Sequence, residues 1–580
     1  MDALEKQILS DIKIDEPWAL VETYSKMPRW EADDVNKGVD HLVGILKRLG
    51  VPVTVHQPEI YLSIPYEASV VAGNETFRAK PPSNSVSVPE GLTGQLVYVK
   101  ADPKNFRSYS PNPKDLFGDQ LGTPEEALAK LKGKIVLTDG FANPANTAIL
   151  QGFGAAAVIA INPGVDIHWG TCTTVWGSPD LDDLPRKPKI PAVAVNNPDG
   201  QKLKELARTG KPVTVKTRLT EGWYAQKLPV VRIPGRESPE KFVLVHGHLD
   251  SWDVGVGDNA TGNATMLEMA RVLWKHRDKL KRSVEIAWWP GHSTGRYAGS
   301  TWYSDAFAIE LDENCVAQVD CDSPGCRWAT SYHQTTSMAE TGDFVLKAIK
   351  DVTGLDGKIK RPNQAGDYSF NNIGISSYFM LSSTMPDDLR AQKNYYAVSG
   401  CGGNIAWHTE NDTLEIADKD VMMTDLKIYT LCTLRNANAD VLPYDWRATA
   451  REFSGTVDSY QKAAGSAFDL APAKKAVADF SAALEKFYAG VGSGKVSKKG
   501  ANEAQQRLAR ILVPINFTHE PRFRHDPAHN AAPLPTLATA TELATMRKDL
   551  IGFARTQLTR GQNRFVAAMR EATRLVEQAA

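Results

Sequence analysis

The sequence predicts an α/β protein in which a sheet with helices on both faces is joined to a β-rich segment and a helical C-terminal region. In residues 226–435, short apolar strands alternate with amphipathic helices, which is typical of a sheet covered on both faces. In residues 61–225, short apolar strands are separated by Gly, Pro, Asn and Asp, and residues 436–580 show long helical periodicity. These three rhythms divide the chain into units of different architecture.

Length and composition agree with a large globular protein. The chain has 580 residues, of which 42% are hydrophobic and 23% are charged, and its length suggests about three or four domains. Lys and Arg number 67 against 68 Asp and Glu, so the formal net charge is −1. A chain without surplus positive charge is not expected to bind nucleic acid or a membrane surface.

The cysteines and the N-terminus indicate a location. Six cysteines form neither a CxxC pair nor a disulfide framework. The N-terminus does not resemble a signal peptide, and no run of 18 apolar residues is present. We therefore expect reduced thiols, no membrane span and a cytoplasmic protein.

The elements before residue 226 follow from local patterns. Helical spacing of apolar residues predicts helices at 2–20 and 33–49, and alternation predicts a strand at 51–57. The next segment is expected to be a compact β-rich insertion with little helix. Its predicted strands are 95–100, 134–138, 156–161 and 190–195, with one helix at 147–154.

The remaining elements alternate and then become helical. Buried strands are predicted at 242–245, 284–289, 316–319 and 375–381, with a helix at 261–276. Reactive groups of such sheets gather just beyond the carboxyl ends of the strands. The C-terminal region is predicted to contain helices at 468–488 and 543–579, with breaks at 490–500 and 514–535.

The sharpest motif directly follows the strand at 242–245. His248 and Asp250 are two residues apart, so on an extended strand end their side chains point the same way. Asp258 lies at the end of a Gly-rich loop that opens into a helix. Imidazole nitrogen and carboxylate oxygen suit zinc or a similar divalent ion, and Asp250 could orient His248.

Two later segments add donors. Asp320 and Asp322 follow the strand at 316–319, and His408 lies far downstream. The candidate direct ligands are therefore His248, Asp258, Asp322 and His408.

Each of these residues alone has a simpler interpretation. A histidine after a buried strand is commonly structural, Asp258 could cap the following helix, and Asp320 and Asp322 could be turn residues. Their joint placement after successive strands favours a metal site over four independent structural roles.

These motifs resemble those of the zinc peptidases of the glutamate carboxypeptidase II and transferrin receptor type, within the wider carboxypeptidase Q-like family. The run at 248–252 (HLDSW) resembles the first metal motif of that family, and Asp258 matches its bridging carboxylate. Asp322 matches a later carboxylate ligand, and the Trp-His-Thr run at 407–409 resembles the final histidine motif.

The resemblance implies a fold and a domain plan. Residues 1–60 and 226–435 would form an aminopeptidase-like, metal-binding domain. Residues 61–225 would be a protease-associated insert, because 154–163 and 190–194 resemble that module. Residues 436–580 would be a helical domain that forms a homodimer, since 517–537 resembles its counterpart.

The resemblance also implies a metal centre of one or two divalent ions, zinc in the family. Asp258 would bridge two ions, His248 and Asp322 would complete one site, and His408 would contribute to the other.

One departure falls on the catalytic machinery. In the family, the strand matching 284–289 is followed by two adjacent glutamates, the first a general base and the second a metal ligand. Here no carboxylate lies between Glu285 and Asp305, and His292 and Ser293 stand at those two positions. Ser293 is a poor ligand, which weakens the second metal site and favours a single ion.

His292 has three interpretations. An imidazole accepts protons near neutral pH, so His292 could act as an unusual base. It could replace the lost ligand, or be a loop histidine in a site that has lost its chemistry. Because general-base assistance typically contributes about 10²–10⁴-fold, its loss would weaken hydrolysis without abolishing it. Arg296 and Tyr297 are candidates for binding a substrate carboxylate or an oxyanion.

The sequence favours a metal-dependent hydrolase acting on an amide, carbamate or peptide-like bond of a small substrate, with His292 and Asp250 as catalytic candidates. Two alternatives stay open: a non-catalytic, receptor-like binding protein and a metal-assisted lyase on the same fold. Bound metal in the purified protein would distinguish the enzymes from the receptor. The glycine-rich segments at 255–257 and 400–403 fit no nucleotide-binding fingerprint.

Overall fold

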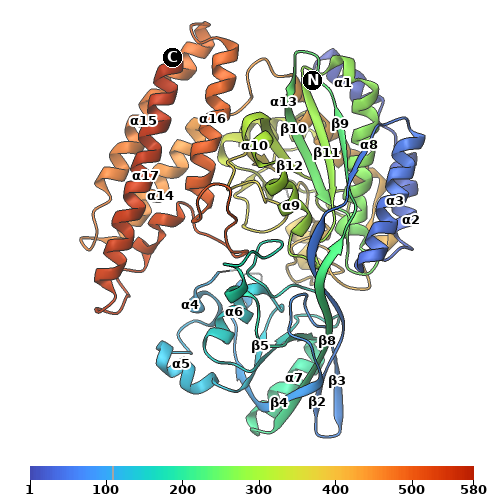
Figure 1. Ribbon diagram of the computed structural model, residues 1–580, viewed down its shortest axis with the longest axis vertical. Coiled ribbons are helices and arrows are strands. Elements are labelled where there is room, and N and C mark those ends of the chain that lie inside the picture. The colour runs from blue at the N-terminus through green and yellow to red at the C-terminus, as the bar shows by residue number, and fades with distance from the viewer. Residues whose placement is uncertain (107–109, 380) are drawn as a thin grey trace.

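The computed structural model describes residues 1–106, 110–379 and 381–580 (Figure 1). Its described residues form two large sheets and a group of long C-terminal helices. The six-stranded sheet has the order β1-β9-β11-β10-β12-β15, and the seven-stranded sheet has the order β3-β2-β8-β4-β5-β6-β7. The predicted α/β fold class is confirmed, and no described helix is long and apolar enough to cross a membrane.

The six-stranded sheet is built around a parallel core. β10 (Ser238–His248) pairs in parallel with both β11 (Arg282–Trp289) and β12 (Cys315–Asp320). Their register places His248 opposite Trp289 and His246 opposite Asp320. Consequently the three strands end at the same edge of the sheet, where the predicted site residues follow. The remaining strands are β1 (Thr54–His56), β9 (Leu228–Ile233) and the short β15 (Ser377–Tyr378).

Helices cover both faces of this sheet, as the strand pattern predicts. Val243 and Val245 of β10 pack on one side with α8 (Thr261–Lys275) and α13 (Lys419–Asn438). The alternate residues Phe242 and Leu244 enter a second apolar cluster on the other side. There they meet side chains of α9 (Ala298–Ala306) and α10 (Ala308–Asn314).

The N-terminal region differs from the prediction in one respect. The expected helix at 2–20 is two helices, α1 (Ala3–Ser10) and α2 (Asp15–Tyr24), whereas α3 (Ala32–Arg48) matches its prediction. Pro17 lies in the first turn of α2, where its missing N–H is tolerated. A continuous helix would place Pro17 in the interior, which is unfavourable.

Residues 59–225 form the second sheet and contain more helix than expected. All four predicted strands are present and lie side by side in the sheet as parallel neighbours. Parallel strands need crossover connections, and helices supply them. The strands are β2 (Glu59–Ala72), β3 (Glu75–Ala79), β4 (Val88–Val99), β5 (Ile135–Asp139), β6 (Ala157–Ile161), β7 (Ala192–Val195) and β8 (Pro212–Ala225), and the helices are α4 (Pro113–Phe117), α5 (Pro124–Leu131), α6 (Pro144–Gly152) and α7 (Asn197–Arg208).

The C-terminal helices pack into a group of their own (Figure 1). They are α14 (Trp446–Ala464), α15 (Ala471–Ser493), α16 (Lys498–Phe517) and α17 (Ile551–Ala579). The first predicted break is shorter than expected, because α15 extends to Ser493 and α16 begins at Lys498. The second begins later, because α16 passes through Pro514, and it is longer than expected, because α17 begins at Ile551. The buried guanidinium of Arg510 ties α16 to the α/β unit by donating to the main-chain oxygens of Leu311, Cys315 and Gly374.

The strand predicted at 375–381 is reduced to the two residues of β15, and Met380 lies outside the described residues.

Candidate metal centre

Four donors from distant parts of the chain converge beyond the ends of β10 and β12. His248 Nε2 lies 2.9 Å from Asp258 Oδ1 and 3.7 Å from Asp322 Oδ2. The other oxygen of Asp258, Oδ2, lies 3.1 Å from His408 Nε2. Asp258 therefore stands between the two imidazoles. The structure brings together all four residues that the sequence proposes as ligands.

Main-chain oxygens fix both imidazoles. His248 Nδ1 lies 2.7 Å from the main-chain oxygen of Asp250, and His408 Nδ1 lies 3.0 Å from that of Trp169. A carbonyl oxygen only accepts hydrogen bonds, so each Nδ1 donates and each Nε2 is the nitrogen that faces Asp258. This arrangement of the second nitrogen is the one that metal-ligating histidines usually show.

Asp250 acts differently from the prediction. It does hold His248, but through its backbone oxygen rather than its carboxylate. The carboxylate instead accepts from the backbone N–H groups of His292 and Ser293, at 2.9 Å each. Asp250 thus anchors the loop that follows β11 to the histidine of β10.

Asp258 is held by a second carboxylate. Asp412 accepts from the backbone N–H groups of Gly257 at 2.7 Å and Asp258 at 3.0 Å. Asn259 then links the strand ends, because its amide donates to the main-chain oxygens of His248 and Cys321. No sequence motif identifies the role of either residue, although Asp412 lies only four positions after His408.

Arg29 supports the loop between Asp250 and Asp258 from the N-terminal region. Its fully buried guanidinium donates to the main-chain oxygens of Leu249, Gly255, Tyr24 and Met27. This loop between Asp250 and Asp258, which we call the metal loop, is therefore held by a residue more than 200 positions away in sequence. No local sequence pattern identifies this role.

The electrostatics of the donors call for a cation. Burial lowers the pKa of His248, but the carboxylates of Asp258 and Asp322 outweigh burial and raise it well above its usual value. Burial raises the pKa of Asp258, but the imidazoles of His248 and His408 outweigh it and hold the pKa well below its usual range. The carboxylates thus favour positive charge at this position, which a divalent ion supplies.

Buried polar atoms without a hydrogen-bond partner also indicate a bound cation. Among the described residues, His248 Nε2 and Asp258 Oδ1 are buried without a hydrogen-bond partner although they lie 2.9 Å apart. Buried polar atoms are normally hydrogen-bonded or bind metal. Two imidazoles and two carboxylates are a donor set that suits zinc. The residues present therefore fit a metal ion.

Comparison with known proteins agrees with this geometry. The family model of peptidase family M28 matches residues 230–428, which contain all four donors. The match covers residues 230–428 and not the remainder of the chain. The resemblance that the motifs indicate is therefore confirmed for this segment, which we call the M28 domain.

Individual relatives are more distant. Carboxypeptidase Q of Bos taurus is 30% identical over 243 residues, covering 40% of this chain and 47% of that protein. Carboxypeptidase Q of Xenopus laevis is 25% identical over 235 residues, covering 35% and 48%. The match thus spans about half the length of these relatives. A zinc aminopeptidase of Bacillus subtilis has 18% identity and a TM-score of 0.54, covering 74% of this chain and 96% of that chain, which shows the shared fold.

The loop after β11 in the M28 domain places His292 against the donors. The rings of His292 and His248 stack with centroids 3.8 Å apart and planes 14° from parallel. One ligand atom each from His248, His292 and Asp322 lie within 4.8 Å of one another. His292 is therefore close enough to be a ligand or to act on a molecule bound beside the donors.

Arg296 and Tyr297 lie in the same loop but are buried. The Tyr297 ring packs between His292 and Trp176, with centroid distances of 5.0 and 4.7 Å. The Arg296 guanidinium stacks on Tyr297 and donates to the main-chain oxygen of Ala528. A role in substrate binding stays a prediction for both residues.

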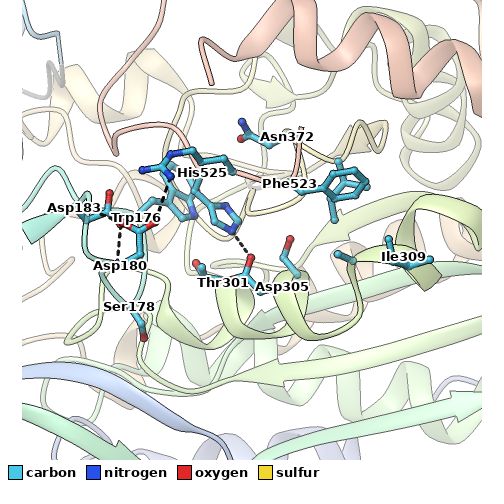
Figure 2. A pocket seen from close by; sticks show the side chains of 14 residues that line it. Trp176, Ser178, Asp180, Asp183, Thr301, Asp305, Ile309, Asn372, Phe523 and His525 are labelled. Atoms are coloured by element: carbon cyan, nitrogen blue, oxygen red, sulfur yellow. Dashed lines mark hydrogen bonds and ion pairs between the residues drawn. The ribbon is translucent and has the colours of Figure 1, made fainter. Parts of the chain in front are cut away.

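A separate cavity of about 460 Å³ opens where the insert, the M28 domain and the C-terminal region meet (Figure 2). Figure 2 shows Thr301 and Asp305 on one wall, with His525 paired to Asp305 at 2.8 Å. The four metal donors do not line this cavity. Trp176, however, lies in its wall.

Proposed function

We propose that this chain is a metal-dependent hydrolase that cleaves an amide, carbamate or peptide-like bond of a small substrate. The observation that carries this proposal is that His248 and His408 flank the Asp258 carboxylate while Asp322 approaches His248. The membership of residues 230–428 in a peptidase family supports the same reaction class. Carboxypeptidases and aminopeptidases among its relatives support a peptide-like substrate.

His248, Asp258 and Asp322 would hold one divalent ion, with zinc as the candidate suggested by the donor set and by the zinc aminopeptidase neighbour. A bound divalent ion lowers the pKa of water and polarises a carbonyl group. His408 and Asp258 alone are a weak second site, because Ser293 stands where a second-site carboxylate would be expected. We therefore propose a centre that binds one ion more tightly than a second.

His292 would take the proton that the missing carboxylate takes in relatives. Its side chain is 14% exposed and lies beside His248 and Asp322, so a substrate reaching the donors also reaches the imidazole. Asp250 fixes the backbone of this loop through two hydrogen bonds. Arg296 and Tyr297 would border the substrate on the side of Trp176.

Three further properties are proposed with this function. Residues 61–225 would be a protease-associated insert, which supports His408 through Trp169. The C-terminal helices would form a homodimer, which light scattering would test by its mass. The cytoplasm would be the location, since all six cysteines are free and buried.

Metal analysis combined with substrate hydrolysis tests the function. The purified protein should contain about one zinc per chain by elemental analysis, and a chelator should lower both its melting temperature and its turnover of acylated amino acids or dipeptides. His248→Ala should lose the metal. Full metal occupancy in that variant would remove His248 from the ligand set.

The same experiment separates the alternatives. A protein without metal, whose stability does not respond to chelator, would favour the receptor-like binding protein. A metal-containing protein that releases an unsaturated product without consuming water would favour the lyase.

A further inference from the structure

A chain of buried hydrogen bonds lies behind His292. His292 Nδ1 lies 2.9 Å from Asp367 Oδ2, and the side chain of Asp367 is fully buried. The other oxygen of Asp367 accepts from Ser300 Oγ at 2.8 Å. Ser300 Oγ lies 2.8 Å from Ser369 Oγ, which accepts from the indole N–H of Trp176 at 2.9 Å.

Three separate parts of the molecule contribute to this network of hydrogen bonds. Ser300 belongs to α9, whereas Asp367 and Ser369 come from the loop before β15. Trp176 comes from the insert and lies in the wall of the cavity that Figure 2 shows. The bonded residues are 67 to 193 positions apart in sequence, so this network of hydrogen bonds forms only in the folded protein.

The chemistry of the groups fixes the direction of the hydrogen bonds at both ends of this network. An indole nitrogen only donates, and a carboxylate only accepts. Ser369 therefore accepts from Trp176, and Ser300 donates to Asp367, with the two hydroxyl oxygens 2.8 Å apart. With one oxygen engaged by Ser300, the other oxygen of Asp367 accepts from His292, so Nδ1 of His292 carries the proton.

This tautomer leaves Nε2 of His292 with a free lone pair. Nδ1 is committed to Asp367 on one side of the ring, and the ring stacks on His248. The ligand atoms of His292, His248 and Asp322 lie within 4.8 Å of one another. Nε2 is therefore the nitrogen that is left to meet a proton or a ligand at the centre.

We propose that Asp367 is a positioning residue that holds His292 as the Nδ1–H tautomer, so that a carboxylate–imidazole pair replaces the single carboxylate base of related peptidases. The proposal rests on the proposed function, because it gives His292 the proton-accepting role. The orienting of a histidine by a buried carboxylate is a recurrent way of presenting one nitrogen as a base. Asp367 touches no reacting atom and acts only through His292.

The decisive variant is Asp367→Asn, which keeps the shape of the side chain. Its single amide oxygen accepts from Ser300, so its NH₂ group faces His292 Nδ1. That nitrogen must then accept, and the ring proton moves to Nε2. The variant thus reverses the tautomer without removing the side chain.

The direct readout is the ring nitrogen chemical shifts of His292 in protein labelled with ¹⁵N-histidine. The chain has 12 histidines, and the His292 signals are those that disappear in His292→Ala. We expect a protonated Nδ1 in the wild type and a protonated Nε2 in Asp367→Asn. A protonated Nε2 in the wild type would overturn the proposal, and this measurement needs no substrate.

Kinetics give the second readout. In Asp367→Asn we expect kcat to fall about 10²–10⁴-fold, the usual contribution of a general base, with KM and metal content unchanged. Adding Asp367→Asn to His292→Ala should cause no further loss, because Asp367 acts through the imidazole. Wild-type turnover in Asp367→Asn, or a further loss in the double variant, would overturn the proposal.

Asp526→Asn is the matched control. Asp526 is equally an acceptor-only buried carboxylate, but it binds the backbone of His519 and Glu520 and the amide of Asn372, away from His292. The activity of the Asp526→Asn variant should stay at the wild-type level. Absence of turnover in the metal-loaded wild type would refute the proposed function, while the nitrogen shifts would still decide the role of Asp367.

Discussion

Asp412 supplies a quantitative test of how the metal loop is built. Its carboxylate accepts from the backbone N–H groups of Gly257 and Asp258. Asp412→Asn retains one acceptor oxygen, so one of these buried N–H groups faces an NH₂ group and loses its partner. An unsatisfied buried donor costs about 1–3 kcal/mol. The free energy of unfolding should fall by this amount.

The same loss should appear in metal affinity, because the displaced N–H belongs to the ligand Asp258 or its neighbour. At about 1.4 kcal/mol for each factor of ten, the metal dissociation constant should rise between about fivefold and 150-fold. This range agrees with the effect of about 10–100-fold that residues supporting metal ligands commonly have. Competition with a chromophoric chelator measures the dissociation constant, and chemical denaturation measures the stability.

Asp526→Asn is again the control, because Asp526 also accepts from two backbone N–H groups, those of His519 and Glu520. It should lower the free energy of unfolding by a similar amount and leave metal affinity unchanged. Equal metal affinity in Asp412→Asn and Asp526→Asn would refute the reasoning, since Asp412 would then stabilise the fold without positioning Asp258.

Three further changes have expected outcomes. Burial raises the pKa of Asp425 to about 6 from an ordinary 3.8. Because the folded protein holds this proton more tightly than the unfolded chain, the carboxyl contributes stability below about pH 4 that is lost as pH rises through 6. The wild type should therefore lose up to about 3 kcal/mol relative to Asp425→Asn between pH 4 and 7, and a pH-independent difference in denaturation would contradict this. Ser293→Glu should raise the zinc content per chain, because it restores a carboxylate at the expected ligand position; an unchanged elemental analysis would count against a second site there. Arg29→Met should lower the free energy of unfolding by at least about 3 kcal/mol, because four buried main-chain oxygens lose a charged donor, and a melting temperature equal to that of the wild type would remove its bracing role.

The resemblance implies two glutamates at the positions where this chain has His292 and Ser293. The proposed ligands His248, Asp258, Asp322 and His408 lie next to a proposed base of another type, so metal binding and catalysis have to be tested separately. Measurements of metal content and turnover on the same preparation are therefore needed together. Metal content alone does not distinguish the hydrolase from the lyase, and absence of turnover alone does not distinguish an inactive enzyme from a binding protein.

Local patterns in the sequence were sufficient for most of the fold. The strands at 242–245, 284–289 and 316–319 lie within β10, β11 and β12, because continuous apolar runs specify strands buried on both faces. The length and continuity of elements were less predictable. The helix expected at 2–20 divides before Pro17, and the insert contains helices that the parallel pairing of its strands requires.

The sequence by itself determined which candidate donors lie together, because His248 and Asp322 come at the carboxyl ends of neighbouring parallel strands, which meet at one edge. Only the tertiary structure decided how these donors are oriented. The supports Trp169, Asp367 and Arg29 come from the insert, a distant loop and the N-terminal region. The run around Asp367 resembles a polar loop near the site of the related family, but local sequence marks neither Trp169 nor Arg29. An orienting hydrogen bond depends on where whole elements pack rather than on any periodicity of the chain.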